Sequence, residues 1–356
     1  MHPWQRRLSP ILLPAGTIYR SLMARRAALY ASGRKHSWAP PVPTVSVGNI
    51  SWGGTGKTPV CSWILDWCER HRLKGAVLTR GYKGKPPALP YPVRPDSPVK
   101  HSGDEPLMLA RDHPTSRIIV DPDRVRGGIW ALEHFRPDLF VLDDGFQHLK
   151  VRRDLNLALF SPADLHEDWD RVIPAGTWRE GGHALHRADC FLVNTMGSAP
   201  ETVQCAAEHR LAPYEKKIYL FTVRADGVIN VQTREGRSDI GSESYLLVTG
   251  IANPDKVVRT AETLLKRSPA EHMTFSDHHA FGEREWAHIR TMSDRLGCRY
   301  ILCTPKDAIK LQNVADKRLW TFRLNLDFPS MTADGDIFPL WWDKELQQKF
   351  HRTISK

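Results

Sequence analysis

The sequence predicts an α/β protein with a mostly parallel sheet of the P-loop NTPase kind, covered by helices on both faces. Short apolar, β-branched runs alternate with segments of helical character, which is the pattern of a parallel sheet. One of these runs passes directly into a glycine-rich turn that ends in Gly56-Lys57-Thr58. Because ligands of such sheets bind at the carboxyl ends of the strands, this turn marks the expected site.

The elements follow in order along the chain. Apolar runs predict strands at residues 45–47, 76–79, 118–120, 140–142, 155–160 and 191–193. Helical patterns predict helices at 57–72, 105–112 and 124–135. The segment 83–98 contains six prolines, and we expect a surface loop there because proline breaks both kinds of regular structure.

Five parts are expected in the chain. Residues 217–233 have the pattern of a β-hairpin around an Asp226-Gly227 turn, and an apolar strand at 245–249 follows. We expect the hairpin to join two lobes. The parts are an N-terminal helix at the membrane interface (1–30), a P-loop core (31–216), the hairpin linker (217–235), a smaller α/β second lobe that closes over the site (236–330) and a C-terminal tail (331–356).

The glycine-rich turn has the chemistry of a phosphate cradle. Backbone N–H groups of such a loop point at the β- and γ-phosphates, a lysine adds charge, and a hydroxyl ligates Mg²⁺. The generic pattern has glycine where this chain has Ser51, but the remaining glycines permit the same close approach. The alternative is an ordinary glycine loop that opens a helix. The expected ATP-binding residues are Ser51, Gly53, Gly54, Thr55, Gly56, Lys57 and Thr58.

Two acidic sites accompany the turn. Asp143 and Asp144 end an apolar strand, and a carboxylate there completes the Mg²⁺ coordination that a P-loop hydroxyl begins. Thr58, Asp143 and Asp144 are therefore the expected metal ligands, with a plain chain reversal at Asp144-Gly145 as the alternative. Asp104 is the second site, and because it precedes a predicted helix its alternative role is that of an N-cap.

Composition is that of a folded soluble protein, with 356 residues, 41% hydrophobic and 25% charged. The formal net charge of +10 favours an anionic partner, which includes nucleotides, phosphorylated lipids, membrane surfaces and nucleic acids, without choosing among them. The six cysteines lack the CxxC pairs and histidine spacing of zinc sites. We therefore expect reduced thiols and no structural metal.

The N-terminal segment mixes apolar residues with arginines. Its uncharged part is shorter than the about 20 residues of a membrane span. Arg6-Arg7 before a short apolar run resembles a signal peptide, but Pro10 and Pro14 interrupt the run. One interpretation is a helix packed on the domain. We favour a helix after Pro14 that lies in the membrane interface, with apolar side chains buried and arginines at anionic headgroups: Ile18, Leu22 and Leu29, with Arg20, Arg25 and Arg26.

Seven motifs, in order over roughly residues 44–310, resemble those of the tetraacyldisaccharide 4′-kinase family, which phosphorylates a membrane-embedded acylated glucosamine disaccharide in lipid A biosynthesis. Thr79 and Pro305 depart from the family's commonest residues, and neither lies in the phosphate cradle. The motifs are Val47 to Pro59, Thr79-Arg80-Gly81-Tyr82, Gly103-Asp104-Glu105-Pro106, Asp143 to His148, Pro174-Ala175-Gly176 with Arg179-Glu180, Ser276-Asp277-His278-His279, and Thr304-Pro305-Lys306-Asp307-Ala308.

The resemblance implies a role for individual residues. Asp104 is implied as the catalytic base, assisted by a histidine of the second lobe, for which we prefer His278 over His279, a candidate packed residue at a helix start. Arg124 is implied as a γ-phosphate partner beside Lys57, with a solvated helix-face cation as the alternative. Pocket residues are implied at Tyr82, Gln147, His148 and Asn194, of which Tyr82, Gln147 and Asn194 have the alternative of core or turn residues.

A P-loop switch NTPase is the alternative function. Proteins of that class carry a lysine directly before the Gly-Gly, where this chain has Trp52, and a guanine-reading Asn/Thr-Lys-x-Asp pattern is absent because Lys306 directly precedes Asp307. A non-enzymatic membrane scaffold does not need Lys57, Asp104 and Asp143, and nucleic-acid binding has only the basic charge behind it. We expect an ATP- and Mg²⁺-dependent kinase, monomeric, at the cytoplasmic face of the bacterial inner membrane, acting on the 4′-hydroxyl of a tetraacylated disaccharide 1-phosphate.

Overall fold

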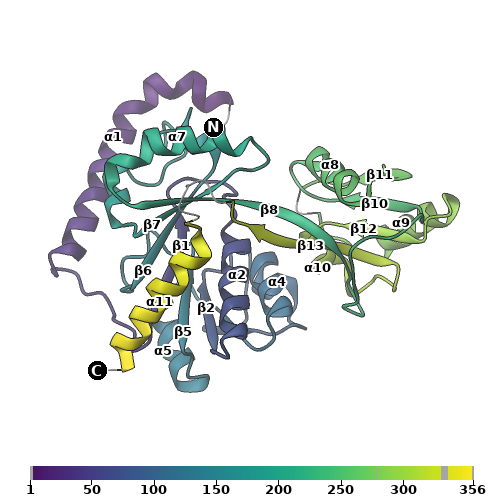
Figure 1. Cartoon of the computed structure of the whole chain (residues 1–356), viewed down its shortest axis with the longest axis horizontal. Coiled ribbons are helices and arrows are strands. Elements are labelled where there is room, and N and C mark those ends of the chain that lie inside the picture. Colours follow the sequence, from purple (N-terminus) through teal and green to yellow (C-terminus); the bar gives the residue numbers. More distant parts are fainter. Residues whose placement is uncertain (1–2, 278, 330–335, 355–356) are drawn as a thin grey trace.

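Two lobes share one continuous sheet in the computed structural model (Figure 1). The structure describes residues 3–277, 279–329 and 336–354, with side chains between residues 11 and 350. Within these residues 13 strands pair in the order β11-β10-β12-β13-β8-β7-β6-β1-β5-β2-β4-β3, and β9 pairs with β8.

The core lobe is a parallel sheet with one antiparallel edge strand, β3. Its strands are almost entirely buried, as expected for a sheet covered on both faces. All six strands predicted for this lobe are confirmed, and β3 lies inside the proline-rich segment predicted as a loop. The strands are β1 (Thr44–Asn49), β2 (Gly75–Thr79), β3 (Tyr91–Val93), β4 (Arg117–Val120), β5 (Leu139–Asp143), β6 (Leu155–Phe160) and β7 (Cys190–Asn194).

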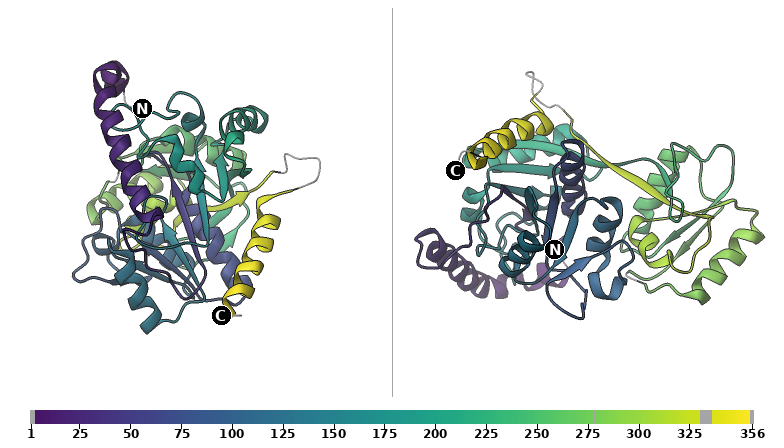
Figure 2. Two further views of the ribbon diagram at one scale, coloured as in Figure 1. Left: turned by 90° about the vertical axis from the view of Figure 1, so that its left-hand side faces the viewer. Right: turned by 90° about the horizontal axis from the view of Figure 1, so that it is seen from below.

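Helices cover both faces of the core sheet (Figures 1 and 2). Alternate strand residues make this possible: Val45 and Val141 pack against α2 and α4, while Phe140 and Leu142 pack with α5 on the opposite face. The helices of this lobe are α2 (Lys57–Arg70), α3 (Val99–Ser102), α4 (Asp104–Asp112), α5 (Arg124–His134), α6 (Pro162–Leu165) and α7 (Pro200–Leu211), with 3₁₀ turns η1 (Gly182–Arg187) and η2 (Ala212–Tyr214).

The predicted hairpin at 217–233 is wrong, because β8 (Lys217–Asn230) runs through it as one strand. Its first residues pair in parallel with β7, and the rest pair antiparallel with β13 (Leu319–Asp327), so β8 carries the sheet from one lobe into the other. Arg323 pairs with Gly227 and Leu324 with Ala225, which leaves Asp226 as an extra residue. Asp226-Gly227 therefore marks a bulge rather than a turn, and a Cβ on Gly227 would lie 2.4 Å from the Arg237 carbonyl oxygen.

The second lobe is a smaller α/β unit. Leu247 and Leu302 face α8, while Leu246 and Ile301 face α9 and α10, so this part of the sheet is also covered on both sides. Its further elements are β9 (Gly236–Arg237), β10 (Tyr245–Thr249), β11 (Glu271–Thr274), β12 (Tyr300–Cys303), α8 (Pro254–Leu265), α9 (Glu283–Arg295) and α10 (Pro305–Leu311).

The C-terminal segment predicted as a tail contains a helix, α11 (Phe338–Ile354), that packs on the core lobe rather than on the second lobe (Figure 1). Phe338, Trp342 and Leu346 recur every four residues on one helix face and are fully buried in the core cluster of α2. Trp67 donates its indole N–H to Asp343 at 2.6 Å. The chain thus returns from the second lobe through β13 and ends on the core.

The N-terminal helix α1 (Pro3–Ala31) lies along the outside of the core lobe (Figure 1). Arg20 donates to the carboxylate of Asp170 at 2.8 Å, and Arg26 donates to the carbonyl of Gln147 at 3.2 Å. Two of the three arginines expected at headgroups therefore bind the protein itself. Ile18 and Leu22 remain 64% and 58% exposed. None of the described helices is long and apolar enough to cross a membrane.

Candidate active site

The glycine-rich turn joins β1 to α2 at the carboxyl end of the core sheet. Gly56 has φ 95°, and a Cβ there would lie 2.9 Å from Asn194 Nδ2 and 3.0 Å from the Phe221 ring. The Asn194 amide donates to the Thr55 carbonyl at 3.2 Å. Only glycine fits this crowded left-handed position, and Asn194 at the end of β7 fixes the loop from behind.

Lys57 is the first residue of α2 and points back across the loop. Its Nζ lies 3.2 Å from Asn49 Oδ1 and 3.5 Å from Asp144 Oδ1. The lysine is thus held by one neutral and one charged oxygen over the turn. Ser51, in contrast, is buried and forms an isolated antiparallel β-bridge with Trp178. Gly53 and Gly54 border open space, because a Cβ added to either would have no atom within 4 Å.

The carboxylates of Asp143 and Asp144 lie beside the loop because β5 is the parallel neighbour of β1, with Val47 opposite Asp143. Thr79 donates to Asp143 at 2.8 Å, and Arg179 donates to Asp144 at 2.7 Å. Burial raises the pKa of Asp143 to about 6. Burial also disfavours ionised Asp144, but Lys57 and Arg179 outweigh it and lower the pKa of Asp144.

The backbone does turn at Asp144, which has φ 51°. Non-glycine residues rarely adopt this left-handed conformation, and they concentrate at functional sites. A chain reversal at Asp144 is therefore compatible with a role of Asp144 as a metal ligand, because the turn directs its side chain toward Lys57 and Arg179.

Thr58 connects the loop to the second lobe. Its hydroxyl donates to Glu105 Oε2 at 2.9 Å, and Glu105 Oε1 lies 3.2 Å from Lys306 Nζ on α10. Glu105 is in the first turn of α4. This chain of contacts runs from the phosphate loop through α4 into the other lobe.

Asp104 is the first residue of α4, and the alternative that it is the N-cap is wrong, because Gly103 occupies that position and no side chain caps the helix. Gly103 has φ 83°, and a Cβ on it would lie 2.6 Å from the Tyr82 carbonyl oxygen. The loop of Tyr82 therefore packs directly against the turn that presents Asp104. The Tyr82 side chain itself is exposed.

Arg124 is buried at the start of α5 rather than on a solvated helix face. It donates to the carbonyls of Pro122 at 3.2 Å and Asp143 at 3.4 Å. Burial, more than the nearby acids, sets the pKa of Arg124, which is lowered. Burial and then Arg124 lower the pKa of His148 to about 4, so His148 is neutral at pH 7.

Gln147 connects the segment after β5 to the end of β1, just before the glycine-rich turn. Its amide donates to the Asn49 carbonyl at 2.9 Å, and its Oε1 accepts from Arg179 at 3.3 Å. His278, the preferred assistant of Asp104, lies outside the described residues. His279 packs between the rings of Phe275 and Phe281, with both centroids 5.0 Å away, ahead of α9.

A cleft of about 1670 Å³ separates the two lobes in front of the loop. Gly53 to Pro59 and Asn194 line it from the core, and Asn253, Lys256 and Lys306 line it from the second lobe. The site is therefore open to a ligand that both lobes contact.

Sequence reasoning gave no role to five residues that hold the site together: Asn49, Thr79, Glu105, Arg179 and Lys306. All five stand in the seven motifs. Their presence there was a signal, but their partners are side chains distant in sequence, which only the fold identifies.

Comparison with known sequences identifies the family. The sequence model described as tetraacyldisaccharide-1-P 4′-kinase matches residues 8–336. The chain belongs to the tetraacyldisaccharide 4′-kinase family. A relative of that name from Nitratidesulfovibrio vulgaris is 42% identical over 340 residues, which is 96% of this chain and 95% of the relative. Another from Oleidesulfovibrio alaskensis is 41% identical over 354 residues, 97% of this chain and 98% of the relative.

A solved structure of the kinase family agrees with the fold. The crystal structure of LpxK from Aquifex aeolicus in complex with ATP is 26% identical and covers 96% of this chain and 99% of its own, with a TM-score of 0.75. The α/β fold class predicted from sequence is confirmed, and family membership decides for a phosphotransferase over the switch NTPase.

Proposed function

We propose that this chain transfers the γ-phosphoryl group of ATP to the 4′-hydroxyl of a tetraacylated glucosamine disaccharide 1-phosphate. The observation that carries the proposal is the position of Lys57, within 3.5 Å of the Asp144 carboxylate at the mouth of a glycine loop. Phosphoryl transfer depends on positioning and charge neutralisation more than on covalent chemistry. A lysine, two carboxylates and an open interlobe cleft are what that reaction needs.

The loop binds the phosphates. Backbone N–H groups of residues 53–58 and the positive end of α2 favour the anionic β- and γ-phosphates. Lys57 adds a charge that follows the phosphoryl group as it moves, and Arg124 and Arg179 add two more near Asp143 and Asp144. Asn194, by holding the Thr55 carbonyl, keeps the loop in the conformation that points its N–H groups outward.

Thr58, Asp143 and Asp144 fit a magnesium ion. All three offer oxygen, which Mg²⁺ prefers, and the buried Oδ1 atoms of both aspartates accept no hydrogen bond within the described residues. These oxygens would hold Mg²⁺, which would supply positive charge against the β- and γ-phosphates. Thr79 and Arg179 donate to the other oxygen of each carboxylate and thereby orient the two Oδ1 atoms.

Asp104 accepts the proton of the attacking hydroxyl. As the 4′-oxygen forms its bond to the γ-phosphorus, the bond from that phosphorus to the β–γ bridging oxygen breaks and ADP leaves, while the hydroxyl proton passes to the Asp104 carboxylate. Asp104 stands next to Glu105, which contacts Thr58, so the proton acceptor at the start of α4 lies near the phosphate loop at the start of α2. We propose His278, which lies outside the described residues, as the assistant of Asp104, and Tyr82, Gln147 and His148 as residues that border the sugar.

Helix α1 brings the enzyme to its lipid substrate at the cytoplasmic face of the inner membrane. Ile11, Ile18 and Leu22 are exposed on one face of α1, with Arg25 one turn further along. The opposite side is fixed to the core through Tyr19 and the Arg20–Asp170 ion pair. Such a helix can bury its apolar face in the headgroup region while the core stays in water. We propose that the enzyme acts as a monomer.

Transfer of label tests the function. Purified protein is incubated with γ-labelled ATP, Mg²⁺, detergent and the disaccharide 1-phosphate lipid, and label should move to the lipid only when all components are present. The matched acceptor control is the same lipid with its 4′-hydroxyl removed, which should stay unlabelled. Label that appears only as free phosphate would instead indicate a switch NTPase and contradict the proposal.

A further inference from the structure

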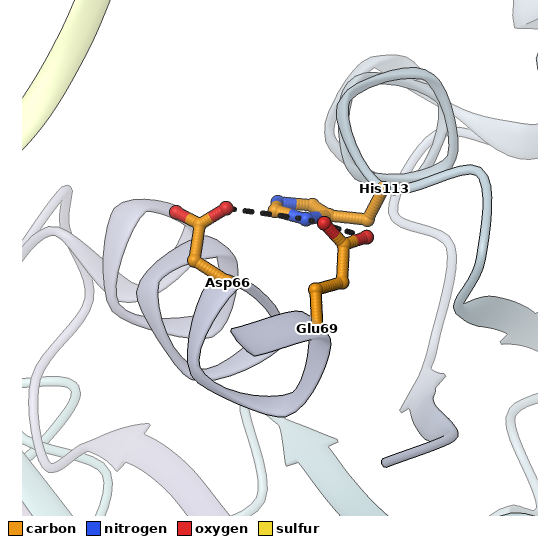
Figure 3. Close-up of side chains that lie close together, drawn as sticks. All are labelled: Asp66, Glu69 and His113. Atoms are coloured by element: carbon orange, nitrogen blue, oxygen red, sulfur yellow. Dashed lines mark ion pairs between the residues drawn. The ribbon is translucent and has the colours of Figure 1, made fainter. Parts of the chain in front are cut away.

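A cluster of three side chains lies at the far end of α2 from the phosphate loop (Figure 3). Asp66 and Glu69 stand three residues apart on one face of α2, and His113 stands at the C-terminal cap of α4. His113 Nδ1 lies 3.6 Å from Asp66 Oδ1 and 3.6 Å from Glu69 Oε1. One ligand atom from each residue falls within 4.8 Å of the others. We propose that these three residues bind a zinc-like divalent cation.

The state of His113 is what points to a cation. Its ring is only 2% exposed, and its Nδ1 atom is buried without a hydrogen-bond partner. The other nitrogen, Nε2, is engaged with Ser62 Oγ at 2.7 Å. Nδ1 therefore faces two carboxylate oxygens across distances too long for a hydrogen bond. A cation between the three groups satisfies the nitrogen lone pair and both negative oxygens at once.

Distances and donor types select the cation. With bonds of about 2.0–2.1 Å, neighbouring ligands of a tetrahedral zinc site stand about 3.3 Å apart, close to the 3.6 Å that separates Nδ1 from each carboxylate oxygen. Imidazole nitrogen suits zinc and neighbouring transition metals, whereas Mg²⁺ and Ca²⁺ prefer oxygen alone. Three protein ligands leave a fourth position for water, which the exposed side of Asp66 admits.

A second layer of contacts orients the ligands. Ser62 lies one turn before Asp66 on α2, and its hydroxyl can accept the Nε2 proton, which leaves the Nδ1 lone pair directed at the carboxylates. Thr115 donates to Glu69 Oε1 at 2.6 Å. Metal-binding histidines and carboxylates are commonly held in this way.

The bound cation would tie two helices that both begin at the catalytic site. Helix α2 begins with Lys57 and Thr58, and α4 begins with Asp104 and Glu105. Asp66, Ser62 and His113 line the same cleft as Lys57. A metal clamp at the rear of the two helices would limit their relative movement while leaving the phosphate loop itself untouched. The expectation of no structural metal rested on cysteine spacing, and this site uses no cysteine.

Zinc titration of the full, untagged chain tests the site. After chelator treatment and dialysis into buffer with excess Mg²⁺, Zn²⁺ binding is measured by calorimetry and the melting temperature is followed with and without Zn²⁺. Wild type should bind one equivalent that Asp66→Asn loses, and Zn²⁺ should raise the melting temperature of wild type only. Asp66 is exposed, so its variant should fold. Ser62→Ala should weaken binding about 10- to 100-fold.

His71→Gln is the matched control, because His71 lies at the same end of α2 outside the cluster and should leave the zinc equivalent in place. Cobalt in place of zinc should give a visible absorption band in wild type and His71→Gln, and none in Asp66→Asn. Binding that Asp66→Asn does not alter would place the metal elsewhere. If wild type binds no equivalent of Zn²⁺, and Asp66→Asn lowers the melting temperature in chelator alone, then His113 pairs directly with the two carboxylates and the proposal is overturned.

Discussion

The Thr58 hydroxyl donates a hydrogen bond to the Glu105 carboxylate across 2.9 Å. Its proton is thereby directed to Glu105, which leaves the lone pairs of the hydroxyl oxygen available as acceptors. A threonine held in this way is ready to ligate a cation without reorientation. Glu105 in turn lies 3.2 Å from Lys306, so the orientation of Thr58 is linked to the position of the second lobe.

Replacing the Thr58 hydroxyl should weaken Mg²⁺ binding, because Thr58 is the proposed metal ligand on α2. Thr58→Val keeps the side-chain shape but removes the oxygen, and we expect the Mg²⁺ concentration at half-maximal turnover to rise at least about tenfold. Thr58→Ser retains the oxygen and is the control, with a midpoint near that of wild type. Superimposable Mg²⁺ titrations of Thr58→Val and wild type would remove Thr58 from the metal site.

Lys57→Ala should reduce turnover by about 10²–10³-fold, since it deletes a preorganised charge from the transferring phosphoryl group. The fold should persist because Asp144 keeps its partner Arg179 at 2.7 Å. Steady-state transfer of label to lipid measures the effect, and circular dichroism checks folding. Lys74→Ala, an exposed lysine away from the cleft, should be unaffected. Wild-type rates in Lys57→Ala would refute the phosphate assignment.

Asp104→Asn should lower kcat by about 10²–10⁴-fold while nucleotide affinity is retained, because an amide cannot accept the hydroxyl proton. Single-turnover transfer and binding of a fluorescent ATP analogue separate the two quantities. Asp143→Asn is the contrasting variant, for which the Mg²⁺ dependence should change as well. An Asp104→Asn enzyme with normal kcat would leave Asp104 a purely structural first residue of α4.

The exposed face of α1 can be tested without removing the helix. Ile18→Glu with Leu22→Glu places charge where apolar burial is proposed, and sedimentation with anionic liposomes should fall at least about tenfold. Truncation is a poorer test because it also removes the Arg20–Asp170 pair. Leu340→Glu is matched, since Leu340 is 60% exposed on α11, and should sediment normally. Full sedimentation of the double variant would exclude this face from membrane binding.

His148 predicts a pH dependence of stability. Burial lowers its pKa in the folded protein from 6.5 to about 4, so between these values the unfolded chain binds a proton that the folded protein does not. The free energy of unfolding should therefore fall as pH drops from about 6.5 to 4. Above pH 6.5, where His148 is neutral in both states, its contribution to the free energy of unfolding is fully present. His148→Gln should flatten this slope in urea titrations. Parallel slopes for variant and wild type would show that His148 titrates normally.

Much of the core and its phosphate loop followed from local sequence. The strand run at 140–142 is apolar at every position, and the run at 155–160 is apolar everywhere except at Asn156, which is the pattern of a sheet covered on both faces. Gly56-Lys57-Thr58 after β1 then marked the candidate site, because a phosphate loop is made by contiguous backbone. Family membership also followed, since seven motifs in order are far more specific than the glycine loop.

The course of the linker and the packing of the C-terminal helix could not be predicted from local sequence. Asp226-Gly227 has the composition of a tight turn, but β13, almost a hundred residues later, pairs along it and converts it to a bulge. The apolar spacing of Phe338, Trp342 and Leu346 predicts a buried face once noticed, yet nothing local says that this face packs on α2 of the other lobe.

The sequence by itself determined which backbone stretches are buried, where the proposed phosphate loop lies and to which family the chain belongs, since each depends on neighbouring residues. Tertiary structure alone decided which side chains hold the reactive groups. Arg179 reaches Asp144, Glu105 reaches Thr58, and His113 reaches Asp66 only because parallel strands and the two helices beside them bring distant segments to one edge. Such pairings depend on strand order and helix packing, which long-range burial sets and no local pattern encodes.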